Sequence, residues 1–244
     1  MAYNKRYDGR KFEELRPMSA ELGVIKQADG SARFTIGDTV AVAAVYGPRN
    51  VHPKFKQNPQ KGIIRANYDM ISFSVTERKR PGPSRRSSEI SLVTENSLLP
   101  SVDLTQFPTA GVDIFIQITQ ANAGTRCAGI TAASMALAHA GIPMRDLVYS
   151  VSAGKVSNKI VIDLDKKEED HPEGATDIPL AFCSRSKEVT LLQVDGNITK
   201  DELMEAIELG KKAGEEIYKL QKETLKGYYK KWIKIILTHY LKKD

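Results

Sequence analysis

Residues 120–126, Gln-Ala-Asn-Ala-Gly-Thr-Arg, join a predicted strand to a predicted helix and decide the expected fold. Before this segment, residues 112–119 alternate Val or Ile with polar or aromatic side chains, which indicates a half-buried strand. After it, residues 127–140 are small and apolar on nearly every face and are followed by Gly141 and Pro143, which predicts a buried helix. The chain is therefore expected to contain a strand–turn–helix unit with its turn at Gly124.

This turn has the composition of an oxyanion site. The first N–H groups of a helix are unpaired and carry a partial positive charge. Gly124 allows a ligand to approach the backbone, Thr125 adds a hydroxyl, and Arg126 adds a guanidinium fork that suits phosphate. The alternative is that Gly124 only shapes a turn and Arg126 pairs with a nearby carboxylate, because no Walker-type spacing is present.

The composition is that of an ordinary globular protein. The 244 residues suffice for one large or two small domains, with 41% hydrophobic and 27% charged residues. No apolar run approaches the roughly 18 residues of a membrane span, and the first ten residues are too polar for a signal peptide. We therefore expect a cytoplasmic protein without a membrane partner. Cys127 and Cys183 lack metal-type spacing and are expected to be small core residues.

The positive charge is concentrated at one end of the chain. The formal net charge is +6, but residues 222–244 hold seven lysines and two acids, a net +5, which leaves +1 elsewhere. The net positive charge is thus mostly a property of this segment, and local basic patches are a better guide to nucleic-acid binding than the net charge.

Two loops carry such patches. From Gly47 to Tyr68 there is no acidic residue, and this loop leads into a strand expected over residues 63–75. It suits a polyanion, and its aromatic residues Phe55 and Tyr68 can either stack on bases or belong to the core. The cations in this loop are Arg49, Lys54, Lys56, Lys61 and Arg65.

The second patch, residues 77–86, is named here the basic loop. Its Pro-Gly-Pro centre cannot be helical, so its cations are expected to be exposed, and Ser84 or Ser87 can cap the helix that follows. The number of arginines beside the start of a helix favours an anion-binding loop over a loop whose charges only face solvent. The cations are Arg78, Lys79, Arg80, Arg85 and Arg86.

The remaining segments suggest two similar halves. Antiparallel strands are expected over residues 22–27, 32–36 and 39–46, the last of them buried on both faces. Further strands are expected over 159–164 and 188–194. Thr199 and Glu202 form a capping box that starts a long helix. Beyond Tyr228 the sequence fits a helix end or a partner contact better than a membrane surface. Each half then consists of strands followed by a long helix.

An acidic segment, residues 168–177, supplies the other chemical candidate. Asp177 directly precedes the apolar residues 178–182, so its carboxylate is expected at the mouth of a strand. Such a carboxylate can bind Mg²⁺ or exchange a proton with a leaving group, and Asp170 is a possible second metal ligand. An oxyanion site, two basic loops and a carboxylate together predict phosphoryl chemistry on a polyanion.

Six motifs resemble those of the RNase PH family, over about residues 6–230. The resemblance implies an α+β fold of the ribosomal protein S5 domain 2-like type, with two duplicated βα halves packed together. We expect an N-terminal arm at 1–16, a first half at 17–145, a second half at 146–231 with a long helix, and a basic and apolar tail at 232–244. The motifs are residues 6–10, 43–49, 77–83, 85–91, 123–126 and 140–146.

Within this family the chain is most similar to the catalytic subunits of archaeal exosomes. The resemblance implies phosphate-dependent 3′→5′ degradation of RNA to nucleoside diphosphates, reversible as RNA tailing. It implies that Gly124, Thr125 and Arg126 hold the attacking phosphate. Asp177 would protonate the leaving 3′-oxygen or, with Asp170, hold Mg²⁺ (or Mn²⁺). The family usually has Asp at the positions of Asn122 and His139.

The resemblance also implies contacts with RNA and with other subunits. Arg86 would grip the phosphate under attack and Arg65 the RNA backbone, with Arg78, Arg80 and Arg85 as further RNA contacts. The expected partners are single-stranded RNA, a related inactive subunit in a hexameric ring with three copies of each, and RNA-binding cap proteins. The alternatives are a non-catalytic RNA-binding scaffold and a bacterial-type homohexamer that trims tRNA 3′ ends.

Overall fold

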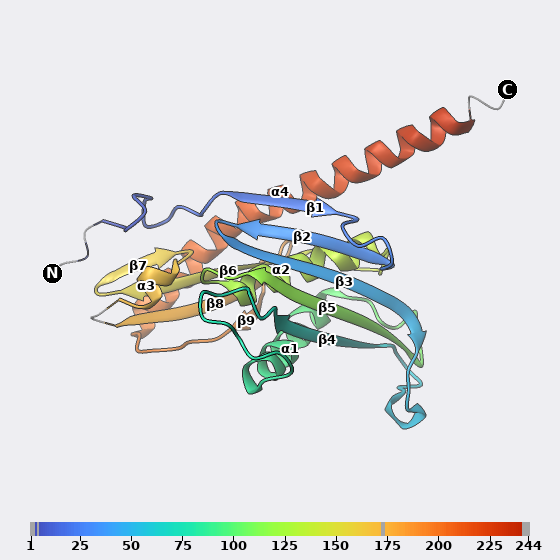
Figure 1. Ribbon diagram of the computed structural model, residues 1–244, viewed down its shortest axis with the longest axis horizontal. Coiled ribbons are helices and arrows are strands. Elements are labelled where there is room, and N and C mark those ends of the chain that lie inside the picture. The colour runs from blue at the N-terminus through green and yellow to red at the C-terminus, as the bar shows by residue number, and fades with distance from the viewer. Residues whose placement is uncertain (1–2, 4, 172–173, 241–244) are drawn as a thin grey trace.

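The computed structural model describes residues 3, 5–171 and 174–240, with side chains as far as residue 233. Two sheets lie side by side, and helices pack between and around them (Figure 1). The first sheet has the strand order β1-β2-β3-β5-β4 and the second β7-β6-β8-β9. The expected α+β class with two halves is confirmed.

The first sheet is antiparallel apart from the parallel pair β4–β5. Its connection from β4 to β5 includes helix α1 (Arg85–Leu98) and the 3-10 turn η2 (Leu99–Ser101). Another 3-10 turn, η1 (Lys54–Lys56), lies between β3 and β4. The strands are β1 (Met18–Leu22), β2 (Gly30–Ile36), β3 (Thr39–Asn50), β4 (Ile63–Met70) and β5 (Ala110–Gln120).

Three strand predictions need correction. The strand expected at 22–27 lies earlier, at β1, because Gly23 adopts a positive φ of 72° and ends it. The strand expected over 63–75 ends at Met70. β3 alternates buried and partly exposed residues along Thr39–Tyr46, so only one of its faces is buried.

The second sheet is antiparallel throughout. A short helix, α3 (Lys166–Glu169), precedes β8. The strands expected at 159–164 and 188–194 are confirmed in shorter form as β7 and β9. The bounds are β6 (Val148–Val156), β7 (Lys159–Ile162), β8 (Ala175–Cys183) and β9 (Val189–Leu192).

Helix α2 (Thr125–His139) is the central helix and contacts β2 and β3 of the first sheet and β6 of the second. Every residue from 127 to 137 is buried, as the small apolar sequence predicts. A Cβ at Gly30 would lie 2.4 Å from the carbonyl oxygen of Ala136, so glycine there lets β2 approach the helix closely. Cys127 and Cys183 are both buried and unpaired, as expected.

Helix α4 (Lys200–Tyr240) begins at the expected capping box, in which the Thr199 N–H donates to Glu202 at 3.0 Å. Ala206, Ala213 and Ile217 are buried where the helix packs against the second sheet. Its C-terminal part projects beyond both sheets (Figure 1). The expected tail at 232–244 thus continues α4 as far as Tyr240, and residues 241–244 lie outside the described part. Among the described residues, no helix combines the length and apolar character needed to cross a membrane.

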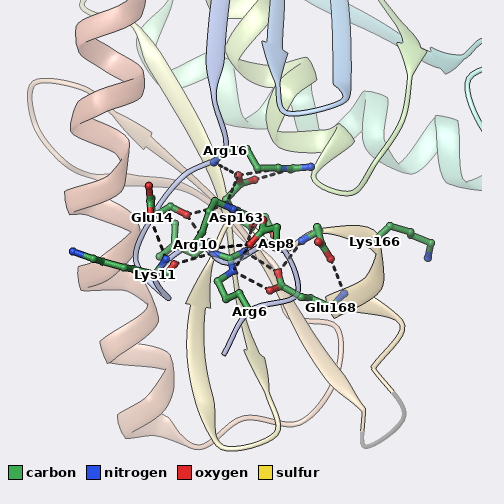
Figure 2. Close-up of polar contacts among 12 residues, drawn as sticks. Arg6, Asp8, Arg10, Lys11, Glu14, Arg16, Asp163, Lys166 and Glu168 are labelled. Carbon is green, nitrogen blue, oxygen red and sulfur yellow. Dashed lines mark hydrogen bonds and ion pairs between the residues drawn. The ribbon is translucent and has the colours of Figure 1, made fainter. Parts of the chain in front are cut away.

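The N-terminal arm docks on the second half through buried charges (Figure 2). The Arg6 guanidinium is inaccessible to solvent and donates to Glu168 at 2.7 Å and to the carbonyl oxygens of Ile162 and Asp163. A buried ion pair is tolerated only when its other polar groups are satisfied, and here they are. Of the expected arm, residues 1, 2 and 4 lie outside the described part.

Candidate active site

The segment around Gly124, residues 122–126, is named here the phosphate turn. Gly124 is the N-cap of α2, with a φ of +61°, and no side chain caps the helix. By contrast, α1, α3 and α4 begin with the side-chain caps Ser84, Asp165 and Thr199. The first N–H groups of α2 are therefore left for a ligand. Thr125 is buried, and its Oγ1 accepts a hydrogen bond of 2.9 Å from the Tyr68 hydroxyl.

Arg126 follows Thr125 and lies among residues from two other segments. Its Nη1 donates to the side-chain oxygen of Gln193, just after β9, and its Nη2 lies 3.6 Å from Glu89 Oε1 on α1. Gln193 also donates to Glu89 at 2.9 Å. Arg126 Nε is buried without a hydrogen-bond partner in the described structure. Arg126 therefore pairs with a nearby carboxylate, as one interpretation of the sequence expected, and it also has a free donor, Nε, that could bind an anion.

Asp177 is the third residue of β8, and its Oδ1 accepts a hydrogen bond of 2.6 Å from Ser152 on β6. Burial raises the pKa of its carboxyl above the usual range. The Ser152 hydrogen bond and the positive charges of Arg126 and Arg86 oppose this effect without cancelling it. A Cβ at Gly124 would lie 4.0 Å from Ser152 Cβ, so β6 places Asp177 beside the start of α2. The structure therefore brings Arg126 and Asp177 together.

The other acidic residues of this region differ in exposure. Asp170 ends α3, pairs with Lys166 at 2.7 Å, and has a side chain 62% exposed. Glu169 is more buried, and burial followed by the negative charge of Asp177 raises its pKa to about 7. Among the described residues, no group of three or more His, Cys, Asp or Glu side chains is arranged to hold a metal ion. Pro172 and Glu173, in the expected acidic loop, lie outside the described part.

The arginines of the basic loop divide into two groups. Arg86 is at the second position of α1, and its charge lowers the pKa values of Tyr68, Glu169 and Asp177, so it lies close to the site. Arg78, Arg80 and Arg85 are exposed at the periphery. The loop starts near the phosphate turn, because the Ala121 N–H donates to the Ser74 carbonyl at 2.9 Å.

Arg65 lies apart from this cluster. It forms a two-pronged ion pair with Asp113 of β5, at 2.6 and 2.9 Å. Arg65 and Tyr68 are three residues apart on β4, so their side chains point to opposite faces of the sheet. Tyr68 is a buried core residue, whereas Phe55 is 82% exposed in the first basic loop.

Several contacts of the site escape sequence reasoning. Gln193 and Glu89 hold Arg126 from positions far away in the sequence, and Ser152 lies on β6, a strand with no distinct sequence signal. Glu169 adjoins Asp170, and no sequence feature distinguishes which of the two is nearer to Asp177. His139 lies at the opposite end of α2, where its Nδ1 accepts from the Ser31 N–H at 3.0 Å.

Comparisons with known proteins identify the family of the chain. The models of the 3′ exoribonuclease family match the chain at residues 14–143 for domain 1 and 146–213 for domain 2. The exosome complex component Rrp41 of Thermococcus kodakarensis is 52% identical over 227 residues, 93% of this chain and 90% of that protein. The same component of Pyrococcus furiosus is 51% identical over the same shares.

Among solved structures, rice (Oryza sativa) Rrp46 shares the fold with a TM-score of 0.80 and 26% identity. The match covers 90% of this chain and 100% of that chain. The two family models together span both sheets and most of the connecting helices, and the curated relatives match nearly the full length. The chain therefore belongs to the RNase PH family of 3′ exoribonucleases.

Proposed function

We propose that this chain degrades RNA from its 3′ end by phosphorolysis, as the catalytic subunit of an exosome ring. Inorganic phosphate is its co-substrate, and nucleoside diphosphates are its products. One observation carries the proposal at the level of the site: the uncapped start of α2, with Arg126, faces the buried carboxyl of Asp177. Family membership and the resemblance to archaeal Rrp41 support it at the level of the chain.

The attacking phosphate binds at the phosphate turn. The free N–H groups at the start of α2, the Thr125 hydroxyl and the Arg126 guanidinium supply its hydrogen bonds. Arg126 exchanges its contacts with Gln193 and Glu89 for the phosphate oxygens. Arg86 holds the terminal RNA phosphate. Two anions repel each other, so a site with two arginines stabilises the transition state in which they meet.

Asp177 supplies the proton for the leaving group. A phosphate oxygen bonds to the terminal phosphorus as the bond to the 3′-oxygen of the preceding nucleotide breaks. That oxygen takes the proton of Asp177, which leaves RNA shortened by one nucleotide and a nucleoside diphosphate. The raised pKa of Asp177 suits a general acid, because it keeps the carboxyl protonated at higher pH. The reverse steps at the same residues extend RNA.

Mg²⁺ (or Mn²⁺) is the cation proposed for the acidic side of the site. Mg²⁺ commonly uses one or two protein carboxylates together with substrate phosphates and water. As the alternative to donating the proton, Asp177 would be ionised and would hold the cation together with Asp170. Glu169 is a neighbouring carboxyl whose pKa is raised by burial and, to a smaller extent, by the negative charge of Asp177. When bound, the cation would stabilise negative charge on the reacting phosphate groups.

Single-stranded RNA approaches through the exposed arginines. Arg78, Arg80 and Arg85 lie at the periphery of the site and supply attraction to the RNA backbone that does not depend on sequence. Arg65, on the other face of the first sheet, contacts RNA farther from the reacting phosphate. We propose a ring with three copies each of this chain and a related inactive subunit, covered by RNA-binding cap proteins.

The test uses single-stranded RNA, Mg²⁺ and the full chain, alone and with the related subunit. Nucleoside diphosphates that form only with phosphate, and are lost in Arg126→Ala and Asp177→Ala, support the proposal. RNA binding without product indicates a scaffold, and monophosphates formed without phosphate indicate a hydrolase. Size-exclusion chromatography separates the assembly types, because a bacterial-type enzyme forms a hexamer alone.

A further inference from the structure

We infer that Arg16 is a positioning residue for phosphate binding, although it is the last residue of the N-terminal arm. It holds the backbone of the phosphate turn through an ion pair with Asp163 of the second half. The inference rests on the proposed role of the phosphate turn. It adds a residue that lies over 100 positions away in the sequence and was not among the expected site residues.

The orientation of the Arg16 guanidinium is fixed by Asp163 (Figure 2). The backbone N–H of Arg16 and its side-chain Nε both donate to one carboxylate oxygen of Asp163, at 2.8 and 2.9 Å. Nη2 donates to the other oxygen at 2.6 Å. The side chains are only 6% and 3% exposed. A pair with so many hydrogen bonds and so little solvent leaves the guanidinium a single orientation.

The remaining nitrogen of Arg16 contacts the phosphate turn. Nη1 donates to the carbonyl oxygen of Asn122. Nη2 lies 3.4 Å from the position that a Cβ on Gly124 would occupy, so the guanidinium packs directly against the turn. Because the charge of Arg16 is matched by Asp163, its contribution to phosphate binding is through the geometry of the turn.

Thr39 supports the same backbone from the first sheet. Its buried Oγ1 accepts from the Asn122 N–H at 3.0 Å and lies 2.8 Å from the carbonyl oxygens of Asn122 and Ala123. A hydroxyl has one proton and can donate to only one of these carbonyls at a time. Arg16 therefore supplies a donor that Thr39 lacks, and the two residues together satisfy both carbonyls.

The turn needs such support because its backbone conformation is unfavourable. Ala123 and Gly124 have φ values of +57° and +61°, and an alanine in this region costs on the order of 1 kcal/mol. In a trans peptide the N–H points opposite to the carbonyl. With the carbonyls of Asn122 and Ala123 directed at Thr39 and Arg16, the next two N–H groups point away from these side chains.

The test compares Arg16→Lys with Arg10→Lys in the full chain. Arg10 also contacts Asp163, at 3.3 Å, but within the described part of the chain it forms no hydrogen bond or ion pair with the phosphate turn. A lysine at position 16 cannot bond Asp163 and Asn122 together with one ammonium group in the same geometry. We expect Arg16→Lys to raise KM for phosphate by about 10- to 100-fold, with KM for RNA unchanged. Arg10→Lys leaves KM for phosphate as in the wild type.

Thermal unfolding with and without inorganic phosphate provides a second readout. Phosphate raises the midpoint of the wild type and of Arg10→Lys, and we expect a smaller rise for Arg16→Lys. If Arg16→Lys does not fold, Thr39→Val and Thr39→Ser replace it. The valine variant lacks the hydroxyl and should raise KM for phosphate. The serine variant keeps the hydroxyl and should have the KM of the wild type.

Two results would overturn the inference. One is an equal change in KM for phosphate in Arg10→Lys and Arg16→Lys, which would mean that docking of the arm alone matters. The other is an unchanged KM in Arg16→Lys or Thr39→Val while Arg126→Lys loses phosphate binding. A wild type that neither binds nor uses phosphate would instead contradict the proposed function itself, so the two failures are distinguishable.

Discussion

The phosphate turn and the basic loop are both proposed to bind phosphate groups, but they are held in different ways. The phosphate turn is fixed by Thr39, Arg16 and Tyr68 through hydrogen bonds with little solvent access. Arg78 and Arg80 of the basic loop project into solvent. In the proposed mechanism the small anion that reacts therefore has a rigid site, while the polymer meets side chains that can adjust to it.

This difference follows from what each ligand requires. One phosphate must be placed within a fraction of an ångström of the reacting phosphorus, so its site gains from rigid N–H donors and a fixed arginine. An RNA chain presents many equivalent phosphates, and exposed cations attract them without a fixed geometry. Substitutions in the fixed region should therefore reduce turnover, and those in the loop should weaken RNA binding.

The largest effect is expected for Asp177→Asn. Asparagine keeps the shape of the side chain but cannot donate a carboxyl proton, so kcat should fall by roughly 100- to 10,000-fold. Single-turnover phosphorolysis of saturating RNA measures this. Asp170→Asn is the matched control: its exposed side chain should affect mainly the Mg²⁺ concentration needed for half-maximal activity. Equal losses of kcat in both variants would contradict the assignment of Asp177 as the acid.

Arg126→Lys should have the next largest effect. Lysine keeps the charge but loses the planar fork that binds the phosphate oxygens in place of Gln193 and Glu89, so kcat/KM for phosphate should fall by roughly 100- to 1,000-fold. Steady-state rates over a range of phosphate concentrations check this. RNA affinity, measured by fluorescence anisotropy without phosphate, should change little, and a large loss of RNA affinity would assign Arg126 to RNA instead.

A smaller effect is expected in the basic loop. Replacing Arg78, Arg80 and Arg85 together by alanine should raise KM for RNA about tenfold at moderate salt and leave KM for phosphate unchanged. Three fewer phosphate contacts should also reduce the salt slope of RNA binding by about 2, at about 0.7 per contact for a single strand. RNA binding titrations at several salt concentrations measure both.

A control variant that loses the same charge elsewhere distinguishes direct RNA contacts of the basic loop from an effect of net charge on RNA binding. Replacing Lys222, Lys226 and Lys230 by alanine removes the same charge from α4, whose Tyr229 contacts Ala138 and His139 at the C-terminal end of α2. Helix α2, with 15 residues, is about 22 Å long, and the phosphate turn lies at its other end. RNA binding and its salt slope should be nearly unchanged. A loss as large as that of the loop variant would show that overall charge, rather than the basic loop, determines RNA affinity.

The smallest effect concerns stability. Glu169 ionises near its ordinary pKa of 4.5 when unfolded and at about 7 when folded. Between these values the folded state keeps a proton that the unfolded state has lost, so the free energy of unfolding falls as pH rises, and the full penalty is present above about pH 7. Glu169→Gln removes the penalty and should add about 1–2 kcal/mol above pH 7, after allowance for partial exposure.

Urea unfolding at pH 5 and pH 8 tests this prediction. The variant should differ little from the wild type near pH 5, where the penalty has only begun to develop, and should be more stable than the wild type at pH 8. Lys166 lies beside Glu169 on α3 and is the control: Lys166→Met removes a neighbouring positive charge and should lower stability at pH 8. If the difference in free energy of unfolding between Glu169→Gln and the wild type were the same at both pH values, the raised pKa of Glu169 would be contradicted.

The sequence predicts the parts of the fold that have local signals. The small apolar run of α2, the Thr199 capping box and the Pro-Gly-Pro loop each specify their own conformation. The strand expected at 22–27 was misplaced because its apolar residues extend past Gly23, whose positive φ ends the strand. β6 was not predicted, since its small residues Ser150, Ser152 and Gly154 give little alternation.

The site residues likewise divide into those that the local sequence predicts and those that depend on contacts between distant segments. The oxyanion turn and Asp177 could be proposed from the sequence because Gly, Thr, Arg and Asp have chemical roles that their neighbours make visible. Arg16, Glu89 and Gln193 could not, because their roles arise from contacts between distant segments. Arg65 belongs to the basic stretch of residues 47–68, but it lies on β4, which directs its side chain to the face of the sheet opposite to that of Tyr68.

The most direct test of phosphorolysis follows the phosphorus atom itself. The assembled protein is incubated with unlabelled single-stranded RNA, Mg²⁺ and ³²P-labelled inorganic phosphate, and the nucleotide products are separated by thin-layer chromatography. The account predicts label in nucleoside diphosphates, at the β-phosphate, and none in the remaining RNA. Unlabelled nucleoside monophosphates, formed at the same rate without phosphate, would show hydrolysis and contradict it.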